Sequence, residues 1–155
     1  MLELILIGTA LIAITVVIHA LGTTTWVRYL IGRHRNDNLA TLRSSVVVLV
    51  SMAVVIFLLH TVEIILWAVA YLVLIPPPEL ATFEEAAYFS FVTFTTLGYG
   101  DITLSQEWRL LSGMEALNGI LLVGWSTAMI FSVMQSIWRE IADNNNVRIP
   151  GAHHD

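Results

Sequence analysis

Hydrophobic residues gather in three long runs along the chain, and more polar stretches separate the runs. The first run covers residues 2–21, the second Val46–Ile75 and the third about residues 110–134. At about 1.5 Å of rise per residue, a helix of about 20 residues crosses the ~30 Å hydrocarbon core of a bilayer. We therefore predict three membrane-spanning helices. The second is about 45 Å long by the same rise, so we expect it to tilt or to project from the bilayer.

A shorter and more polar segment, residues 80–107, lies between the second and third runs and is too short to cross the bilayer and return. Thr82 and Glu85 have the spacing of a capping box, which predicts a helix over residues 83–95 that covers half the membrane. Two glycines follow this helix, where non-helical backbone costs little. We therefore predict an all-α membrane protein with three spanning helices and one re-entrant helix.

The composition supports the membrane assignment. Hydrophobic residues make up 57% of the 155 positions, charged residues 12%, and the mean hydropathy is +0.78, outside the range of soluble domains. The lack of cysteine excludes disulfides and thiolate metal sites. The first run begins with Glu3 and lacks the basic start of a signal peptide, so we expect it to remain as a span. Neither a soluble regulatory domain nor a nucleic-acid partner is expected.

The positions of the basic residues predict the orientation. All of them are arginines, namely Arg28, Arg33, Arg35, Arg43, Arg109, Arg139 and Arg148. Four lie between the first two runs and two follow the third, whereas a single one lies on the side of the re-entrant helix. The positive-inside rule then places the C-terminus in the cytoplasm and the N-terminus outside. No run carries a basic residue at every third position, which excludes a voltage sensor of the usual kind.

The residues after the re-entrant helix, Thr96 to Gly100, read TLGYG. Glycines at alternate positions allow left-handed backbone conformations, which turn successive carbonyl groups to one side. Several copies of such a segment around an axis would form rings of oxygens that replace the water around a cation. The re-entrant helix would direct its negative dipole end towards the same cavity.

The run AAYFSFVTFTTLGYGD, Ala86 to Asp101, resembles the pore helix and selectivity filter of potassium channels. The similarity continues through WRLLSGMEALNG, residues 108–119, which resembles the start of the inner helix of bacterial channels with two helices per pore loop. The resemblance implies passive potassium-selective conduction, with no enzyme activity and no cofactor besides bound K+. It also implies a homotetramer in the inner or plasma membrane, because each chain supplies one filter segment.

The resemblance assigns roles to particular positions. It implies that K+ is bound at Thr96, Leu97, Gly98 and Tyr99, and that Gly100 completes the ion-binding segment. Thr95, Asp101 and Glu115 are expected to support the filter. For Asp101 we consider both a hydrogen bond behind the filter and attraction of cations at the outer mouth. Leu97 replaces the commoner Val or Ile, and Val92 stands where some members carry a glutamate that bonds the filter acid.

The resemblance also divides the chain into functional parts. Residues 1–22 form an additional N-terminal helix, 23–45 a cytoplasmic connection, 46–138 a potassium-channel pore domain and 139–155 a short cytoplasmic tail. Within the pore domain we expect an outer helix at 46–75, a pore helix at 83–95, a filter at 96–101 and an inner helix at 108–138.

Several polar residues within the predicted spans need partners in the protein. Glu115 fits either a buried brace between the inner and pore helices or a proton-sensitive group, and Asn118 three positions later is a candidate partner. His60 and Glu63 lie on one face of the second span. They fit an inter-helix hydrogen bond, a pH-sensing pair or a metal site, and His19 of the first span is a candidate neighbour.

Glycines also have two interpretations in the third span. Gly119 and Gly124 fit either a gating hinge or close helix packing, whereas for Gly113 we favour packing. The final residues His153, His154 and Asp155 follow Pro150 and are expected to form a disordered tail instead of a metal site.

Three other functions remain open on the sequence. A non-selective cation channel would require a disturbed outer filter, although Tyr99 and Gly100 are intact. An intramembrane enzyme using His19, His60 and Glu63 would leave the glycine-tyrosine-glycine segment without a purpose. The last alternative is a non-conducting subunit that only assembles with other channels.

Overall fold

The computed structural model describes residues 1–33, 42–76 and 79–144, and within these ranges it contains four α-helices and no β-strand. The helices are α1 (Leu2–Arg33), α2 (Leu42–Leu74), α3 (Phe83–Phe94) and α4 (Arg109–Asn144). Helices α1, α2 and α4 are long and apolar enough to span a membrane. The predictions of an all-helical fold and of three candidate spans are confirmed.

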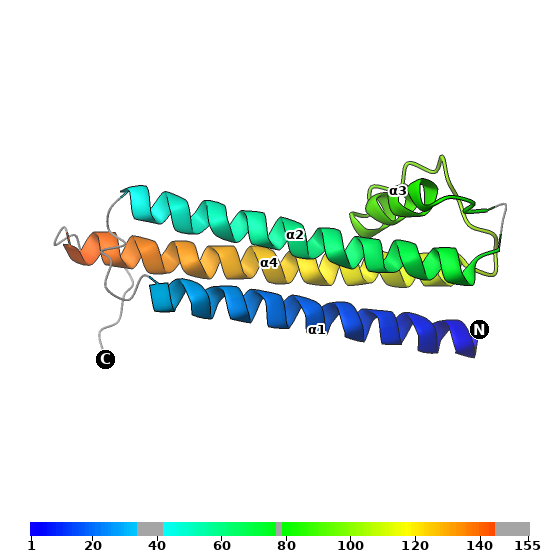
Figure 1. Ribbon diagram of the computed structural model, residues 1–155, viewed down its shortest axis with the longest axis horizontal. Helices are drawn as coiled ribbons and strands as arrows, with labels where there is room; N and C mark the ends of the chain where they lie inside the picture. Colours follow the sequence, from blue (N-terminus) through cyan, green and yellow to red (C-terminus); the bar gives the residue numbers. More distant parts are fainter. Residues whose placement is uncertain (34–41, 77–78, 145–155) are drawn as a thin grey trace.

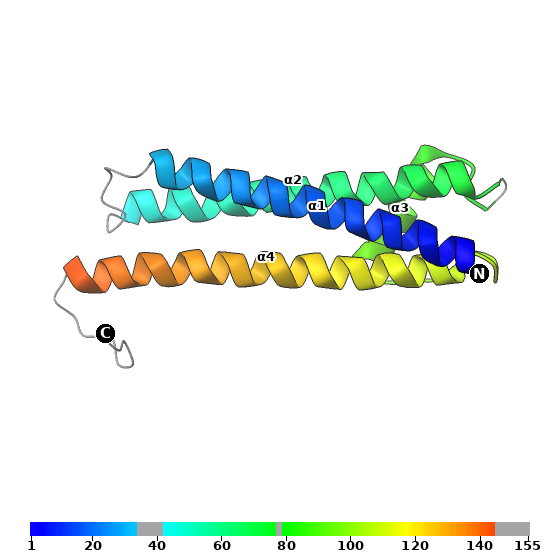
Figure 2. The same ribbon diagram turned by 90° about the horizontal axis from the view of Figure 1, so that it is seen from below.

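The three long helices run side by side, and the short helix α3 lies at one end of the bundle (Figures 1 and 2). The N-terminus of α1 lies at this same end, whereas α4 finishes at the opposite end. Helix α1 contacts both α2 and α4, and α3 packs on α2 and α4. The bundle therefore holds α3 against the two helices that flank it in the sequence, and α1 is an additional helix on their other side.

Helix α1 is longer than its hydrophobic run. It continues to Arg33, so the residues expected to begin the first connection after position 22 are helical. Within this extension the Thr23 hydroxyl donates a hydrogen bond to the backbone oxygen of His19 at 2.6 Å, so this polar side chain is satisfied without ending the helix. Helix α4 likewise continues past the predicted end at residue 138 to Asn144.

The capping box predicted for α3 is present. The Glu85 amide donates to the Thr82 hydroxyl at 3.2 Å, and the Glu85 carboxylate accepts from the Thr82 amide at 3.1 Å. These two bonds satisfy backbone donors that the first helical turn leaves free. The start of α3 at Phe83 therefore follows directly from the sequence.

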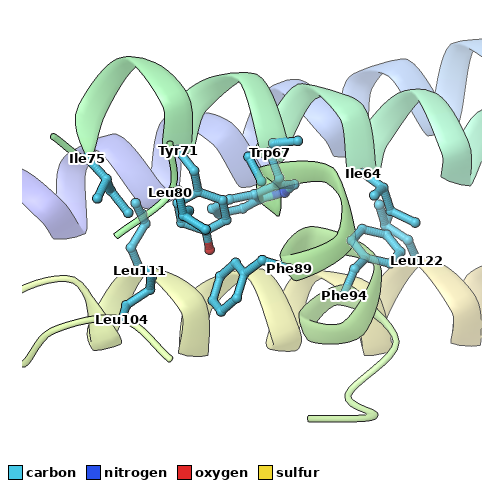
Figure 3. Packing of buried hydrophobic residues seen from close by; sticks show 12 residues of the cluster. Ile64, Trp67, Tyr71, Ile75, Leu80, Phe89, Phe94, Leu104, Leu111 and Leu122 are labelled. Atoms are coloured by element: carbon cyan, nitrogen blue, oxygen red, sulfur yellow. The ribbon is translucent and has the colours of Figure 1, made fainter. Parts of the chain in front are cut away.

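A hydrophobic core fills the space between α2, α3 and α4 (Figure 3). Trp67 and Tyr71 of α2 are fully buried. Phe89 of α3 lies beside Tyr71, and Phe94 of α3 lies beside Ile64 of α2 and Leu122 of α4 (Figure 3). The rings of Tyr71 and Phe89 meet edge to face with centroids 5.2 Å apart, a favoured aromatic geometry. This packing fixes both the position of α3 and the place where the backbone leaves it.

Candidate functional site

The backbone after α3 alternates between left-handed and ordinary conformations. Thr96, Gly98 and Gly100 have φ angles of 60°, 55° and 79°, whereas the intervening Leu97 and Tyr99 do not have positive φ. In a regular strand successive residues face opposite sides. The alternating sign of φ instead turns successive carbonyl groups towards one side. Two of the three left-handed positions are glycines, for which this conformation is unstrained.

The amides of the same segment bond to the end of α3. The Leu97 and Gly98 amides donate to the backbone oxygen of Val92 at 2.9 and 3.3 Å, and the Thr96 amide donates to the oxygen of Thr93 at 2.9 Å. Among the described residues, no hydrogen bond to the carbonyl oxygens of residues 96–100 is present. The first three residues of the segment therefore use their amides for anchoring, and the carbonyl oxygens stay available for other ligands. Backbone oxygens are ligands of hard cations.

The side chains of this segment are exposed in a single chain. Leu97 is 56% exposed and Tyr99 67%, although both are large and partly or wholly apolar. Adjacent Thr95 is also exposed, and its hydroxyl donates to the backbone oxygen of Phe91 at 2.7 Å. One chain therefore leaves this segment open on the side away from α3.

Asp101 forms a hydrogen bond with α3. The Tyr88 hydroxyl donates to the Asp101 carboxylate at 2.7 Å. Of the two roles considered for Asp101, a hydrogen bond behind the filter and attraction of cations, the first corresponds to this contact. This bond lowers the pKa of Asp101 below its usual 3.8 and raises the pKa of Tyr88 above 10.0. Sequence reasoning missed Tyr88; the available signal was a phenol on α3 that faces the acid just after the glycines.

Glu115 is fully buried, and its carboxylate accepts a hydrogen bond from the Tyr71 hydroxyl at 2.7 Å. This bond joins α4 to α2, and an interaction with the Ser90 hydroxyl also joins Glu115 to α3, the re-entrant helix that the sequence suggested. The expected help from Asn118 is wrong, because its amide instead donates to the Thr15 hydroxyl of α1 at 2.9 Å. The Ser90 hydroxyl of α3 is buried beside this carboxylate.

A closed ring of polar contacts joins the three long helices. Nδ1 of His19 lies 2.9 Å from one oxygen of Glu63, and Nδ1 of His60 lies 2.9 Å from the other. The Nε2 atoms of His60 and His19 lie 3.1 and 3.2 Å from the Ser126 hydroxyl. His19 is thus the neighbour that the sequence suggested for the His60–Glu63 pair, and Ser126 of α4 is a member that sequence reasoning missed.

The glycines of α4 differ in their surroundings. A Cβ atom on Gly119 would overlap the backbone oxygen of Phe94, so this glycine allows α4 to approach the end of α3 closely. Gly113 and Gly124 have no heavy atom of the described chain within 4 Å of such a Cβ. The packing role expected for Gly113 is therefore absent within one chain. His153, His154 and Asp155 lie outside the described residues.

Comparison with known proteins identifies one family. A family model described as an ion channel matches residues 46–136, more than half of the chain. The match covers nearly all of α2, all of α3, the segment with alternating φ and most of α4, whereas α1 lies outside it. No curated protein and no solved structure matches the chain.

Proposed function

Because the chain belongs to the ion channel family, whose model matches residues 46–136, we propose that it forms a potassium-selective channel. K+ passes passively through a pore built from four copies of the chain. The observation that carries this proposal is the backbone of residues 96–100, with alternating φ, amides anchored on α3 and carbonyls without donors.

The carbonyl oxygens of Thr96, Leu97, Gly98 and Tyr99 are the proposed K+ ligands, as in the filters of potassium channels, where carbonyl rings replace the hydration shell. Each chain contributes one wall of the ion path. The exposure of Leu97 and Tyr99 in a single chain supports this arrangement, because neighbouring subunits would cover them. Gly100 completes the segment, and Thr95, Asp101 and Glu115 support it from behind.

Helix α3 contributes electrostatically. Its C-terminal end lies at Phe94, directly before the proposed filter, and its acidic residues Glu84 and Glu85 lie in the first turn. The negative end of the helix dipole therefore faces the side from which the filter begins, where it would favour a cation. The dipole effect falls off within the last helical turn, so it acts only on an ion close to that turn.

We further propose the orientation and the membrane. The arginines near the C-terminal end of α1 and the end of α4 lie in the cytoplasm, so the end of the bundle that carries α3 and the N-terminus faces outside. The membrane is an inner or plasma membrane. Large apolar side chains exposed on all three long helices, such as Val17, Phe57 and Leu121, suit contact with lipid or neighbouring subunits.

Flux through liposomes tests the proposal. Purified protein is reconstituted, and K+ and Na+ fluxes are measured separately, with the symmetry of the particles determined in parallel. We expect K+ flux without Na+ flux and four-fold symmetry. Equal flux of both ions would instead indicate a non-selective channel, and tetramers without flux would indicate a non-conducting subunit.

Two glycine substitutions test whether the K+ flux depends on the proposed filter. Gly98→Ala places a side chain at a φ of +55° and should abolish or strongly reduce K+ flux. Gly113→Ala is the matched control, since it adds the same methyl group at an open helical position. Equal K+ flux in Gly98→Ala and wild-type protein would contradict the assignment of the filter.

A further inference from the structure

The ring formed by His19, Glu63, His60 and Ser126 contains a metal-ligand set. One ligand atom from each of His19, His60 and Glu63 lies within 4.8 Å of the other two. Two imidazoles with one carboxylate form a set typical of Zn²⁺ and similar transition-metal ions. From this arrangement we propose that the three side chains bind a divalent transition-metal ion of the Zn²⁺ class, at a site distinct from the proposed K+ filter.

Ser126 can accept from both imidazoles, and this arrangement is the one that a metal requires. Its hydroxyl oxygen lies 3.1 and 3.2 Å from the Nε2 atoms of His60 and His19, and one oxygen can accept two N–H groups. A histidine that donates from Nε2 to an outer oxygen presents its Nδ1 lone pair to an ion. Both Nδ1 atoms already face Glu63, so the ligands converge before any ion arrives.

The separations need only small adjustments. Each Nδ1 atom lies 2.9 Å from a Glu63 oxygen, whereas ligands around a tetrahedral Zn²⁺ lie about 3.3 Å apart at the usual bond lengths. The two imidazole rings are stacked with centroids 5.2 Å apart and planes 26° from parallel. Binding therefore requires each ring to tilt towards the ion, with Ser126 as the common pivot.

The hydrogen-bonded ring is the metal-free form of this site. Its four contacts each need one proton, and the four side chains hold four such protons when their net charge is zero. A neutral ring suits its burial among membrane-spanning helices, where an unpaired charge is costly. A divalent ion would displace the two protons between the Nδ1 atoms and the carboxylate: one leaves the site, and the other moves to the Nε2 atom that accepts from Ser126 in the neutral ring, so both Nε2 atoms then donate to Ser126.

The ion would reach the site from the His60 side and leave a position for one more ligand. His19 and Glu63 are fully buried, whereas the His60 side chain is 16% exposed in a single chain. Three protein ligands leave the fourth tetrahedral position for water or an anion. A bound anion such as hydroxide would offset the one positive charge that remains from a divalent ion and Glu63.

A bound ion would connect the whole bundle. His19 belongs to α1, His60 and Glu63 to α2, and Ser126 to α4. The ion would fix α1 to α2 by direct coordination and hold α4 through Ser126. Coordination through His19 would give α1, which lies outside the family match, a specific role in the bundle.

Co²⁺ absorption tests the site in the full-length purified protein. The chain has five histidines, so the experiment uses a background with His34, His153 and His154 changed to alanine. We expect one Co²⁺ per chain with the visible absorption of a tetrahedral site, displaced by Zn²⁺. No binding by this protein, or an octahedral spectrum alone, would overturn the proposal.

Variants in the same background identify the ligands. His60→Gln or Glu63→Gln should weaken Co²⁺ binding at least a hundredfold, and Ser126→Ala should weaken it about 10–100-fold through loss of ligand orientation. Thr127→Ala is the matched control, because this exposed hydroxyl bonds only to its own helix at Val123. Unchanged Co²⁺ affinity in folded His60→Gln or Glu63→Gln protein would contradict the site.

The metal experiment is independent of the proposed channel function. Co²⁺ absorption requires no ion flux, so a protein that binds Co²⁺ but conducts no K+ would support the metal site and contradict the channel. Size-exclusion profile and circular dichroism of each variant confirm its fold. A His19→Gln variant that is folded and still binds Co²⁺ with wild-type affinity would also contradict the site.

Discussion

Gly119 is the residue whose small size the structure explains most directly. A methyl group at this position would overlap the backbone oxygen of Phe94, which cannot move away as a flexible side chain could. We expect Gly119→Ala to lower the stability of the assembled protein by about 1–3 kcal/mol, the usual cost of overpacking. The thermal unfolding midpoint of the protein in detergent measures this effect.

Gly113→Ala serves as the control for Gly119→Ala. It lies on the same helix with no neighbour within 4 Å, so alanine there should leave the midpoint unchanged or raise it through better helix propensity. Equal midpoints for the two variants would show that contact with Phe94 does not constrain α4. Close packing would then be the wrong explanation for Gly119.

The bond between Tyr88 and Asp101 has a defined pH dependence. Because it lowers the pKa of Asp101, its contribution to stability is present above pH 3.8 and is lost as the pH falls through the lowered value. We expect Tyr88→Phe to raise the pKa of Asp101 towards 3.8, as measured by NMR titration of the carboxyl carbon. An unchanged Asp101 pKa in this variant would show that the bond is absent in solution.

At the scale of helices, the Tyr71–Glu115 contact links α2 to α4. Tyr71→Phe removes the hydroxyl that donates to Glu115 and leaves a buried carboxyl group without that partner. We expect a loss of about 1–3 kcal/mol in stability, since an unsatisfied buried polar group costs that much. Thermal unfolding of the variant in detergent, compared with wild type, measures the loss.

The double variant Tyr71→Phe with Glu115→Leu, in which the acceptor is removed, separates this contact from a general packing defect. Because the two side chains are direct partners, the two single effects should not add. Additive effects of the two changes would mean that the contact itself contributes nothing. Glu115→Gln alone retains an oxygen that can accept from Tyr71, so it should be milder than Tyr71→Phe.

Helix existence could be predicted from the sequence, but some helix ends could not. The α3 start depends on Thr82 and Glu85, which are three residues apart, and such local bonds can be read directly. The end of α1 could not, because Thr23 looks like the start of a polar loop until its hydroxyl bonds back to His19. Polar residues that bond within their own helix do not end it.

The candidate site shows the same distinction over longer distances. The sequence could identify residues 96–100 as backbone with left-handed conformations, because glycine adopts these conformations without strain. The sequence could not identify the partner of Asn118, since Thr15 lies 103 residues away and Glu115 is nearer in the sequence. Which face of α4 meets α1 is determined by the packing of the complete bundle.

At the scale of the whole molecule, α1 packs against the family domain but is not part of it. A truncated chain that begins at Leu42 lacks His19, the partner of Glu63, and Thr15, the partner of Asn118. We expect this chain to assemble, because the core between α2, α3 and α4 remains, but to unfold at a lower temperature. Addition of a peptide of residues 1–41 during reconstitution should restore part of the loss, and an unchanged midpoint after truncation would contradict a stabilising role for α1.

The ring around Glu63 also affects how the protein is made. Helix α1 precedes α2 and α4 in the chain, so during synthesis it enters the membrane before them, with His19 already within it. Its partner Glu63 follows 44 residues later, and Ser126 follows 107 residues later. Until α4 leaves the translocon, the nascent helix carries an imidazole whose bonds are incomplete. Helix α4 therefore completes contacts that α1, inserted before it, has left open.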